Sequence, residues 1–185
     1  GKTFIALSLA LEDVLDKNTR YDRVVIIRSI VPTRDIGFLP GDEEEKKEAY
    51  TAPYRGIITD ICSGDSEAWT KLIASGELEF MSTSFIRGMT ISNAIIVVDE
   101  FQNLNFHELD SVITRMGNNC KIVMCGDYYQ SDFTKDMEKK SVLKFLEIIQ
   151  RLNKFSNIEF TWQDIVRSDI VRDYIMTKEM LGITS

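Results

Sequence analysis

The stretch AIIVVDEFQNLN, Ala94–Asn105, decides the fold, because five apolar residues run directly into the adjacent carboxylates Asp99 and Glu100. A short unbroken apolar run is typical of a strand that is buried on both faces, as in a parallel sheet covered by helices. Ligands of such sheets bind beyond the carboxyl ends of the strands. We therefore expect Asp99 and Glu100 at the edge of the sheet where a ligand lies.

Other strands and helices alternate along the chain, which predicts an α/β fold: a parallel sheet with helices on both faces. The segment 30–41 carries two prolines and two glycines and is predicted to be an irregular loop, and the acidic residues 42–45 suit the start of a helix. Strands are predicted at 23–29, 78–82, 94–99 and 120–127, an edge strand at 157–162, and helices at 3–17, 66–76, 106–117, 141–152 and 164–181.

The composition favours one domain over residues 1–185, with 44% hydrophobic and 28% charged residues and a net charge of −7. No apolar run reaches the roughly 18 residues of a membrane span, so we expect a cytoplasmic protein without a membrane partner. Three cysteines, Cys62, Cys120 and Cys125, form no CxxC pair, which argues against a zinc site. The net charge makes a strongly basic face unexpected, but composition neither requires nor excludes a nucleic-acid partner.

The chain begins GKTFIALSLALED, and Gly1-Lys2-Thr3 leading into a helix is the second half of the phosphate-binding loop GxxxxGK[ST]. Lys2 would reach the β- and γ-phosphates of a nucleotide, the Thr3 hydroxyl would ligate Mg²⁺, and free N–H groups at the helix start would cradle the anion. The alternative is a chance start to a helix. The sequence lacks the first half of the loop and its preceding strand, so we expect an N-terminal segment to complete the site and ATP to bind poorly without it.

Two further motifs match this half-loop. The apolar strand ending in Asp99-Glu100 is typical of a Walker B element, in which Asp99 holds Mg²⁺ and Glu100 polarises the attacking water. In VMCGDYYQSD, Gln130 would lie beside the γ-phosphate if its strand neighbours the Walker B strand. Taken singly, these motifs also fit a solvated acidic turn and an ordinary Gly-Asp turn. Their order and spacing together predict hydrolysis of a nucleoside triphosphate.

Four stretches of the chain together match the pattern of a known family: RSIVPTRDIGFLPG (28–41), IRGMTISNAIIVVDEFQN (86–103), TRMGNNCKIVMCGDYYQSD (114–132) and DIVRSDIV (164–171). Through them the chain resembles the PhoH family of P-loop ATPases, which is related to the helicase core of superfamily one. Met89, Phe101 and Ser168 depart from the family pattern of Arg, Ala and His, and none of the three belongs to the predicted chemistry. The resemblance implies a RecA-like single-domain ATPase that uses ATP and Mg²⁺ and assembles into ring-like homo-oligomers, often hexamers.

In rings of this kind a neighbouring subunit commonly donates an arginine to the γ-phosphate. Arg167 and Arg115 are the candidates here, and the alternative for each is a surface ion pair or a charge at a helix C-terminus. Arg28 and Arg34 are expected either to contact nucleic acid or to shape the site, and the sequence does not rank the two roles.

Two alternative functions stay open at this point. Thymidine kinases also carry a GKT loop and a DExQ segment, with the Glu acting as a base on the sugar hydroxyl, but they usually add a cysteine-bound zinc that these three cysteines cannot build. A nucleotide-gated scaffold without useful turnover is the non-enzymatic alternative, against which Glu100 and Gln130 argue. Coupling of hydrolysis to single-stranded RNA or DNA is an open expectation.

Overall fold

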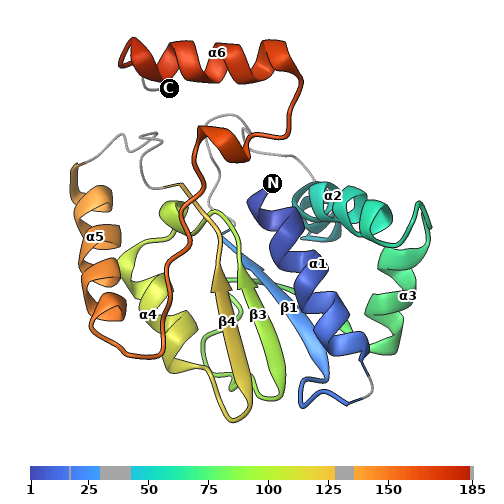
Figure 1. Cartoon of the computed structure of the whole chain (residues 1–185). Helices are drawn as coiled ribbons and strands as arrows, with labels where there is room; N and C mark the ends of the chain where they lie inside the picture. The colour runs from blue at the N-terminus through green and yellow to red at the C-terminus, as the bar shows by residue number, and fades with distance from the viewer. Residues whose placement is uncertain (17, 30–42, 128–135, 184–185) are drawn as a thin grey trace.

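The computed structural model describes residues 1–16, 18–29, 43–127 and 136–183, and its centre is a four-stranded, all-parallel sheet (Figure 1). The strands are β1 (Arg23–Arg28), β2 (Leu78–Ser82), β3 (Ala94–Val98) and β4 (Cys120–Met124). They lie in the order β2-β1-β3-β4, so the two most apolar strands, β1 and β3, are central. The predicted parallel α/β fold is confirmed.

Helices cover both faces of the sheet (Figure 1). On one face lie α1 (Lys2–Leu15), α2 (Glu43–Ile61) and α3 (Ala68–Ser75), and on the other lie α4 (Phe106–Thr114) and α5 (Asp136–Gln150). Neighbouring residues of a strand point to opposite faces, so β3 sends Ile95 and Val97 into the first core and Ile96 and Val98 into the second. This double burial is why the run of five apolar residues is unbroken.

The chain after α5 differs from the prediction. Residues 157–161 form no strand, and the proposed edge strand is wrong. The segment instead ends in a 3₁₀ turn, η2 (Trp162–Asp164), closed by a capping box in which the Thr161 N–H donates to Asp164 Oδ2 at 2.6 Å. This box holds Asp164 in the turn, so α6 (Asp169–Met180) begins five residues later than predicted.

The segment before η2 and the helix α6 both leave apolar side chains in water. Ile158 is 80% exposed and Phe160 is 44% exposed. Figure 1 shows α6 beyond the end of the sheet at which the N-terminus of the chain lies.

Among the helices in the described part of the chain, none combines the length and the apolarity that crossing a membrane would require.

Candidate functional site

Asp99 follows β3 at the carboxyl end of the sheet, and its side chain is only 6% exposed. Its carboxylate accepts a hydrogen bond from the Thr3 hydroxyl, which lies 2.7 Å from Oδ1. A second hydrogen bond comes from the Tyr54 hydroxyl, which lies 2.8 Å from Oδ2. Residues 3 and 99 are far apart in sequence, so the fold itself brings the half phosphate loop and the acidic strand end together.

Helix α1 places the half-loop at this edge of the sheet. Leu7 and Leu11 are 0% and 2% exposed in the first core and fix α1 against β1 and β3. Gly1 is the N-cap and supplies no side chain to cap the helix, and no acidic residue occupies the first turn. The N–H groups of a helix start carry partial positive charge. The exposed Lys2 adds a full positive charge. The corner of the molecule where the start of α1 meets the end of β3 therefore suits a phosphate group.

Glu100 adopts a left-handed backbone conformation, with φ +49° and ψ +45°. This conformation costs roughly 1–2 kcal/mol in a residue that is not glycine, so neighbouring contacts must hold it. The Gln102 side chain supplies one of them, because its Nε2 donates to the Glu100 carboxylate. Its Oε1 in turn accepts from the backbone N–H of Asp127 at 3.1 Å. Gln102 therefore ties Glu100 to the segment that follows β4.

Gly126 is the residue that lets this link form. A Cβ at position 126 would lie 2.4 Å from Gln102 Oε1 and 2.5 Å from the Phe101 ring. The backbone agrees with this close approach, since the Phe101 N–H donates to the Cys125 carbonyl oxygen at 3.1 Å. The segment that follows β3 and the segment that follows β4 are thus in direct contact.

The Cys125 thiol lies beneath the same corner and is 6% exposed. Burial, and then the negative charges of Asp99 and Glu100, raises the pKa of Cys125 to about 12, while Lys2 opposes this shift. A pKa in that range keeps the thiol neutral at physiological pH. Lys2, Asp99 and Glu100 are thus all close enough to Cys125 to affect its pKa.

Tyr54 and Gln102 are site residues that the sequence did not identify. A sequence pattern could have pointed to Gln102, since it belongs to the DEFQN stretch, but that stretch does not show what the Gln102 amide contacts. No sequence pattern pointed to Tyr54, because nothing in the local sequence distinguishes it from Tyr50, another buried tyrosine on α2. Burial, followed by the Asp99 charge, raises the pKa of Tyr54 far above its usual value, and Arg28 beside it opposes the shift.

Four further residues were predicted to act at or near the site, namely Gln130, Arg34, Arg167 and Arg115. Gln130 and Arg34 fall outside the described residues. Arg167 is exposed between η2 and α6, and the described hydrogen bonds of the Thr3 and Asp99 side chains go to other residues. Arg115 ends α4 and its carbonyl oxygen accepts from the N–H of Ile91, ahead of β3, which is the opposite end of the sheet from Asp99. Neither arginine joins the corner formed by Thr3, Asp99 and Glu100.

The donor set at this corner fits a magnesium–nucleotide complex. Within the described ranges, no group of three or more His, Cys, Asp or Glu side chains is arranged to hold a metal ion. Mg²⁺ bound with a nucleotide takes only one or two protein oxygens and completes its shell with phosphates and water. Thr3 Oγ1 and the Asp99 carboxylate, which touch at 2.7 Å, are such a pair.

Comparison with known proteins agrees with these observations. Residues 1–179 match the family model described as "PhoH-like protein". A PhoH-like protein of Synechocystis sp. is 31% identical over 189 residues, covering 100% of this chain and 55% of the relative. Protein PhoH2 of Bacillus subtilis is 36% identical over 135 residues, covering 71% of this chain and 30% of the relative. Protein PhoH of Escherichia coli is 28% identical over 169 residues, covering 91% of this chain and 47% of the relative. The chain spans about half the length of most of these relatives.

Proposed function

Because the chain belongs to the PhoH-like family, a family of P-loop NTPases, we propose that it binds ATP with Mg²⁺ and hydrolyses the γ-phosphate. The observation that carries this proposal is the 2.7 Å hydrogen bond between Thr3 and Asp99. A hydroxyl from a GKT sequence and a carboxylate from an apolar strand end meet in P-loop sites because both serve the same metal ion. No ordinary packing requirement explains a buried carboxylate at this position.

Each residue of the corner has a proposed task. Gly1, Lys2 and the start of α1 bind the phosphates, and Thr3 and Asp99 hold Mg²⁺, which when bound would neutralise phosphate charge. Glu100 orients and polarises the attacking water, and the Gln102 amide holds its carboxylate in place. The role predicted for Gln130, beside the γ-phosphate, stays a prediction. Arg167 is proposed to act in the site of a neighbouring subunit of a ring.

Phosphate release from ATP tests the hydrolysis proposal. Glu100→Gln keeps the size and the polarity of the side chain but removes the base, so turnover is expected to fall about 10²–10⁴-fold while nucleotide binding persists. Glu12→Gln, the same change on the exposed surface of α1, is the matched control and is expected to have no effect. Equal activity in wild type and Glu100→Gln would contradict the proposal. Transfer of phosphate to a nucleoside would instead support a nucleoside kinase, and tight binding without turnover would support a scaffold.

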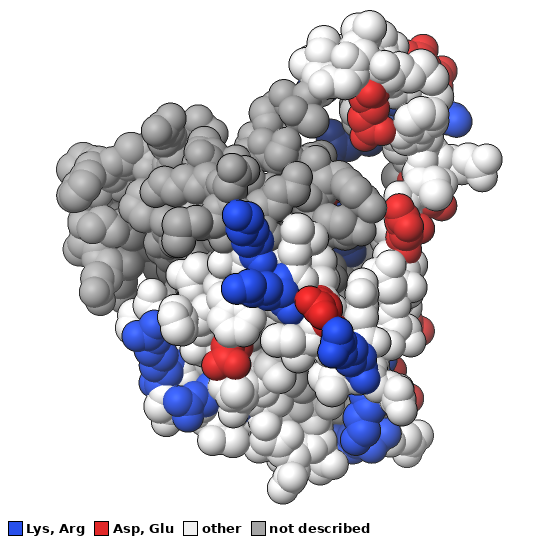
Figure 2. All heavy atoms as spheres, turned by 90° about the vertical axis from the view of Figure 1, so that its left-hand side faces the viewer, with Lys and Arg blue, Asp and Glu red and all other residues white. Residues whose placement is uncertain are grey.

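Coupling to single-stranded RNA or DNA is the second part of the proposed function, and a basic face supports it. Lys140, Lys144 and Arg151 are exposed and spaced to lie along one side of α5 and its end. Figure 2 views this side of the molecule, and Lys and Arg side chains gather along it. Lys144 and Arg151 also line a hollow of about 250 Å³ together with Phe106 and Ile148.

This face has the chemistry that a nucleic-acid backbone requires. Lysine and arginine neutralise phosphates and release counterions, and a neighbouring aromatic ring can stack on a base. One acidic residue, Glu147, lines the same hollow and pairs with Arg151 at 2.7 Å, but both side chains are exposed, so the pair is weak and a phosphate can compete for Arg151. The face is basic although the chain as a whole carries a net charge of −7. Local rather than bulk charge would therefore direct a polyanion to α5.

Fluorescence anisotropy with a labelled single-stranded oligonucleotide tests the basic face. The double variant Lys144→Glu, Arg151→Glu is expected to bind at least about tenfold more weakly. The slope of log affinity against log salt should become shallower by about 0.7 for each phosphate that the variant no longer neutralises. Arg20→Glu, Lys71→Glu changes the net charge equally at exposed positions away from α5. The same loss in both double variants would mean that bulk charge, and not this face, governs binding.

A further inference from the structure

We propose that Tyr54 is a positioning residue for the magnesium-binding carboxylate, because its hydroxyl holds one oxygen of Asp99 and so leaves the other oxygen to Thr3 and the metal. The inference rests on the proposed function, since it assumes that Asp99 serves Mg²⁺ in an ATP site. It goes beyond the GKT and DE motifs, neither of which includes a residue of α2.

The two hydrogen bonds to Asp99 reach it from different elements. Thr3, in the first turn of α1, donates to Oδ1 at 2.7 Å, and Tyr54, in the middle of α2, donates to Oδ2 at 2.8 Å. A carboxylate held at only one oxygen can rotate about its last torsion. A carboxylate that is held at both oxygens presents a defined edge to a metal ion. Residues that hydrogen-bond to metal ligands commonly orient them in this way.

Packing gives the Tyr54 hydroxyl a fixed position. The residue is 1% exposed, and its ring lies against Phe80 of β2 with the ring centroids 5.7 Å apart and the planes at 45°. Ile58, one turn later on α2, is fully buried in the same core. The hydroxyl is therefore carried by a ring that cannot turn away without opening the core, which is the support that a precise metal site needs.

Arg28 extends the arrangement to the end of β1. Its guanidinium lies close enough to affect the Tyr54 hydroxyl. Arg28 also precedes Ser29, and the segment from Ser29 leads along the chain to α2, on which Tyr54 lies. The Tyr54 hydroxyl thus lies within reach of both the Asp99 carboxylate, which it contacts at 2.8 Å, and a cation from the end of β1.

Tyr54→Phe removes the hydroxyl and keeps the ring, so it isolates the hydrogen bond. Tyr50→Phe is the matched control, since Tyr50 is a buried tyrosine one turn earlier on the same helix and in the same core. Asp99→Asn is the reference for loss of the metal site. Titration of ADP-loaded protein with Mn²⁺, followed by electron paramagnetic resonance of the free ion, measures metal affinity without any turnover. Magnesium dependence of phosphate release gives a second readout, and thermal unfolding checks each fold.

We expect Tyr54→Phe to weaken Mn²⁺ binding about 10-fold or more, as is usual when a partner of a metal ligand is lost. The Mg²⁺ concentration for half-maximal turnover should rise in parallel, with little change once metal is saturating, and Tyr50→Phe should match wild type. Wild-type metal affinity in Tyr54→Phe, with lost affinity in Asp99→Asn, would overturn this inference alone. Wild-type affinity in Asp99→Asn as well would mean that the proposed ATP site itself is wrong.

Discussion

At the scale of single residues, the close approach at Gly126 gives a direct test of the link between the two strand ends. Gly126→Ala forces a methyl group to within 2.5 Å of Gln102 and the Phe101 ring, so one of them must move. We expect a loss of about 1–3 kcal/mol in the free energy of unfolding, the usual cost of overpacking. We also expect reduced turnover, because Gln102 would release Glu100. Denaturant titration measures the first effect and phosphate release the second.

Gly56→Ala is the matched control for Gly126→Ala. Gly56 lies inside α2, and a Cβ there would meet nothing within 4 Å. Alanine is favoured over glycine in a helix by about 1 kcal/mol, so this variant should be neutral or more stable. Destabilisation by both substitutions would mean that loss of glycine itself, and not the contact with Gln102, explains the effect.

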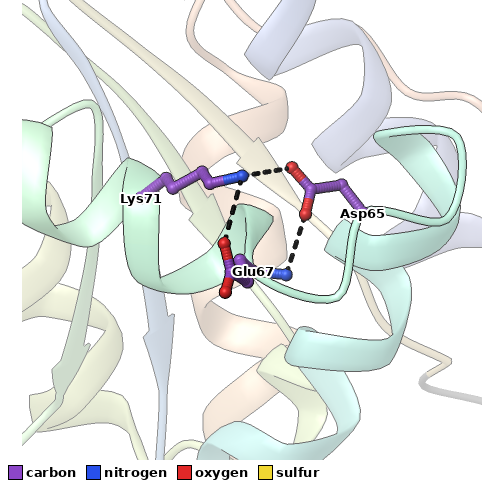
Figure 3. A network of polar contacts seen from close by, with 3 residues as sticks. All are labelled: Asp65, Glu67 and Lys71. Carbon is purple, nitrogen blue, oxygen red and sulfur yellow. Dashed lines mark hydrogen bonds and ion pairs between the residues drawn. The ribbon is translucent and has the colours of Figure 1, made fainter.

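The turn between α2 and α3 gives a prediction for pH. Figure 3 shows Lys71 Nζ between two carboxylates, 2.9 Å from Asp65 and 3.4 Å from Glu67. The hydrogen bond from Lys71, and then the backbone N–H of Glu67, lowers the pKa of Asp65. Because the folded-state pKa is lowered, the stabilising effect is present above the unfolded-state pKa and disappears as pH falls through the folded-state pKa. An NMR titration should give Asp65 a midpoint below that of an ordinary Asp. Lys71→Ala should raise that midpoint towards the ordinary value.

At the scale of elements, the start of α4 is held by more than an ordinary cap. Asn105 Oδ1 accepts from the Glu108 N–H at 3.0 Å, and Glu108 Oε2 accepts from the Asn105 N–H at 2.8 Å. The other oxygen of Glu108 accepts from the hydroxyls of Ser29 and Thr83, which follow β1 and β2. Glu108 therefore joins the helix start to the ends of two strands.

Two substitutions separate the helix cap from this tertiary link. Asn105→Ala should cost about 1 kcal/mol of unfolding free energy, the usual value for a lost cap. Glu108→Ala should cost more, because it also leaves the buried hydroxyls of Ser29 and Thr83 without their acceptor. Denaturant unfolding of both variants measures the difference. Equal losses would mean that Glu108 acts only as a capping residue.

A sequence prediction succeeded where the structural feature leaves a pattern in the local sequence, and it failed where the feature depends on residues that are far apart in the sequence. The central strands were predictable because double burial leaves a local mark, the unbroken apolar run of β3. The strand proposed at 157–162 was wrong because alternating apolar residues such as Ile158 and Phe160 permit a strand but do not supply a partner to pair with. The contact of Thr3 with Asp99 was anticipated from two motifs. Tyr54 was not, since its role depends on how α2 crosses the sheet, which no local pattern records.

At the scale of the whole molecule, the described chain leaves apolar surface around Arg167. Val166 is 90% exposed, and Ile170 and Tyr174 of α6 are 78% and 68% exposed. Neighbouring apolar side chains that stay in water are typical of surfaces that contact another protein. A second copy of this chain is the occupant that the proposed ring requires, and it would bring Arg167 to the Thr3–Asp99 corner of its neighbour.

Subunit mixing tests whether Arg167 acts across such an interface. Arg167→Ala alone and Glu100→Gln alone should both lose most of their ATP turnover. When the two variants are mixed under conditions in which subunits exchange, a site can form from the intact Glu100 of one chain and the intact Arg167 of its neighbour. Turnover of an equal mixture should then recover to about a quarter of wild type, because about one site in four is complete and an arginine that stabilises γ-phosphate charge acts on the rate wherever it is supplied. If Arg167 serves its own chain, every site in the mixture lacks one of the two residues and no activity returns. Arg172→Ala, a change on α6 five residues further on, is the control and should keep its activity without mixing.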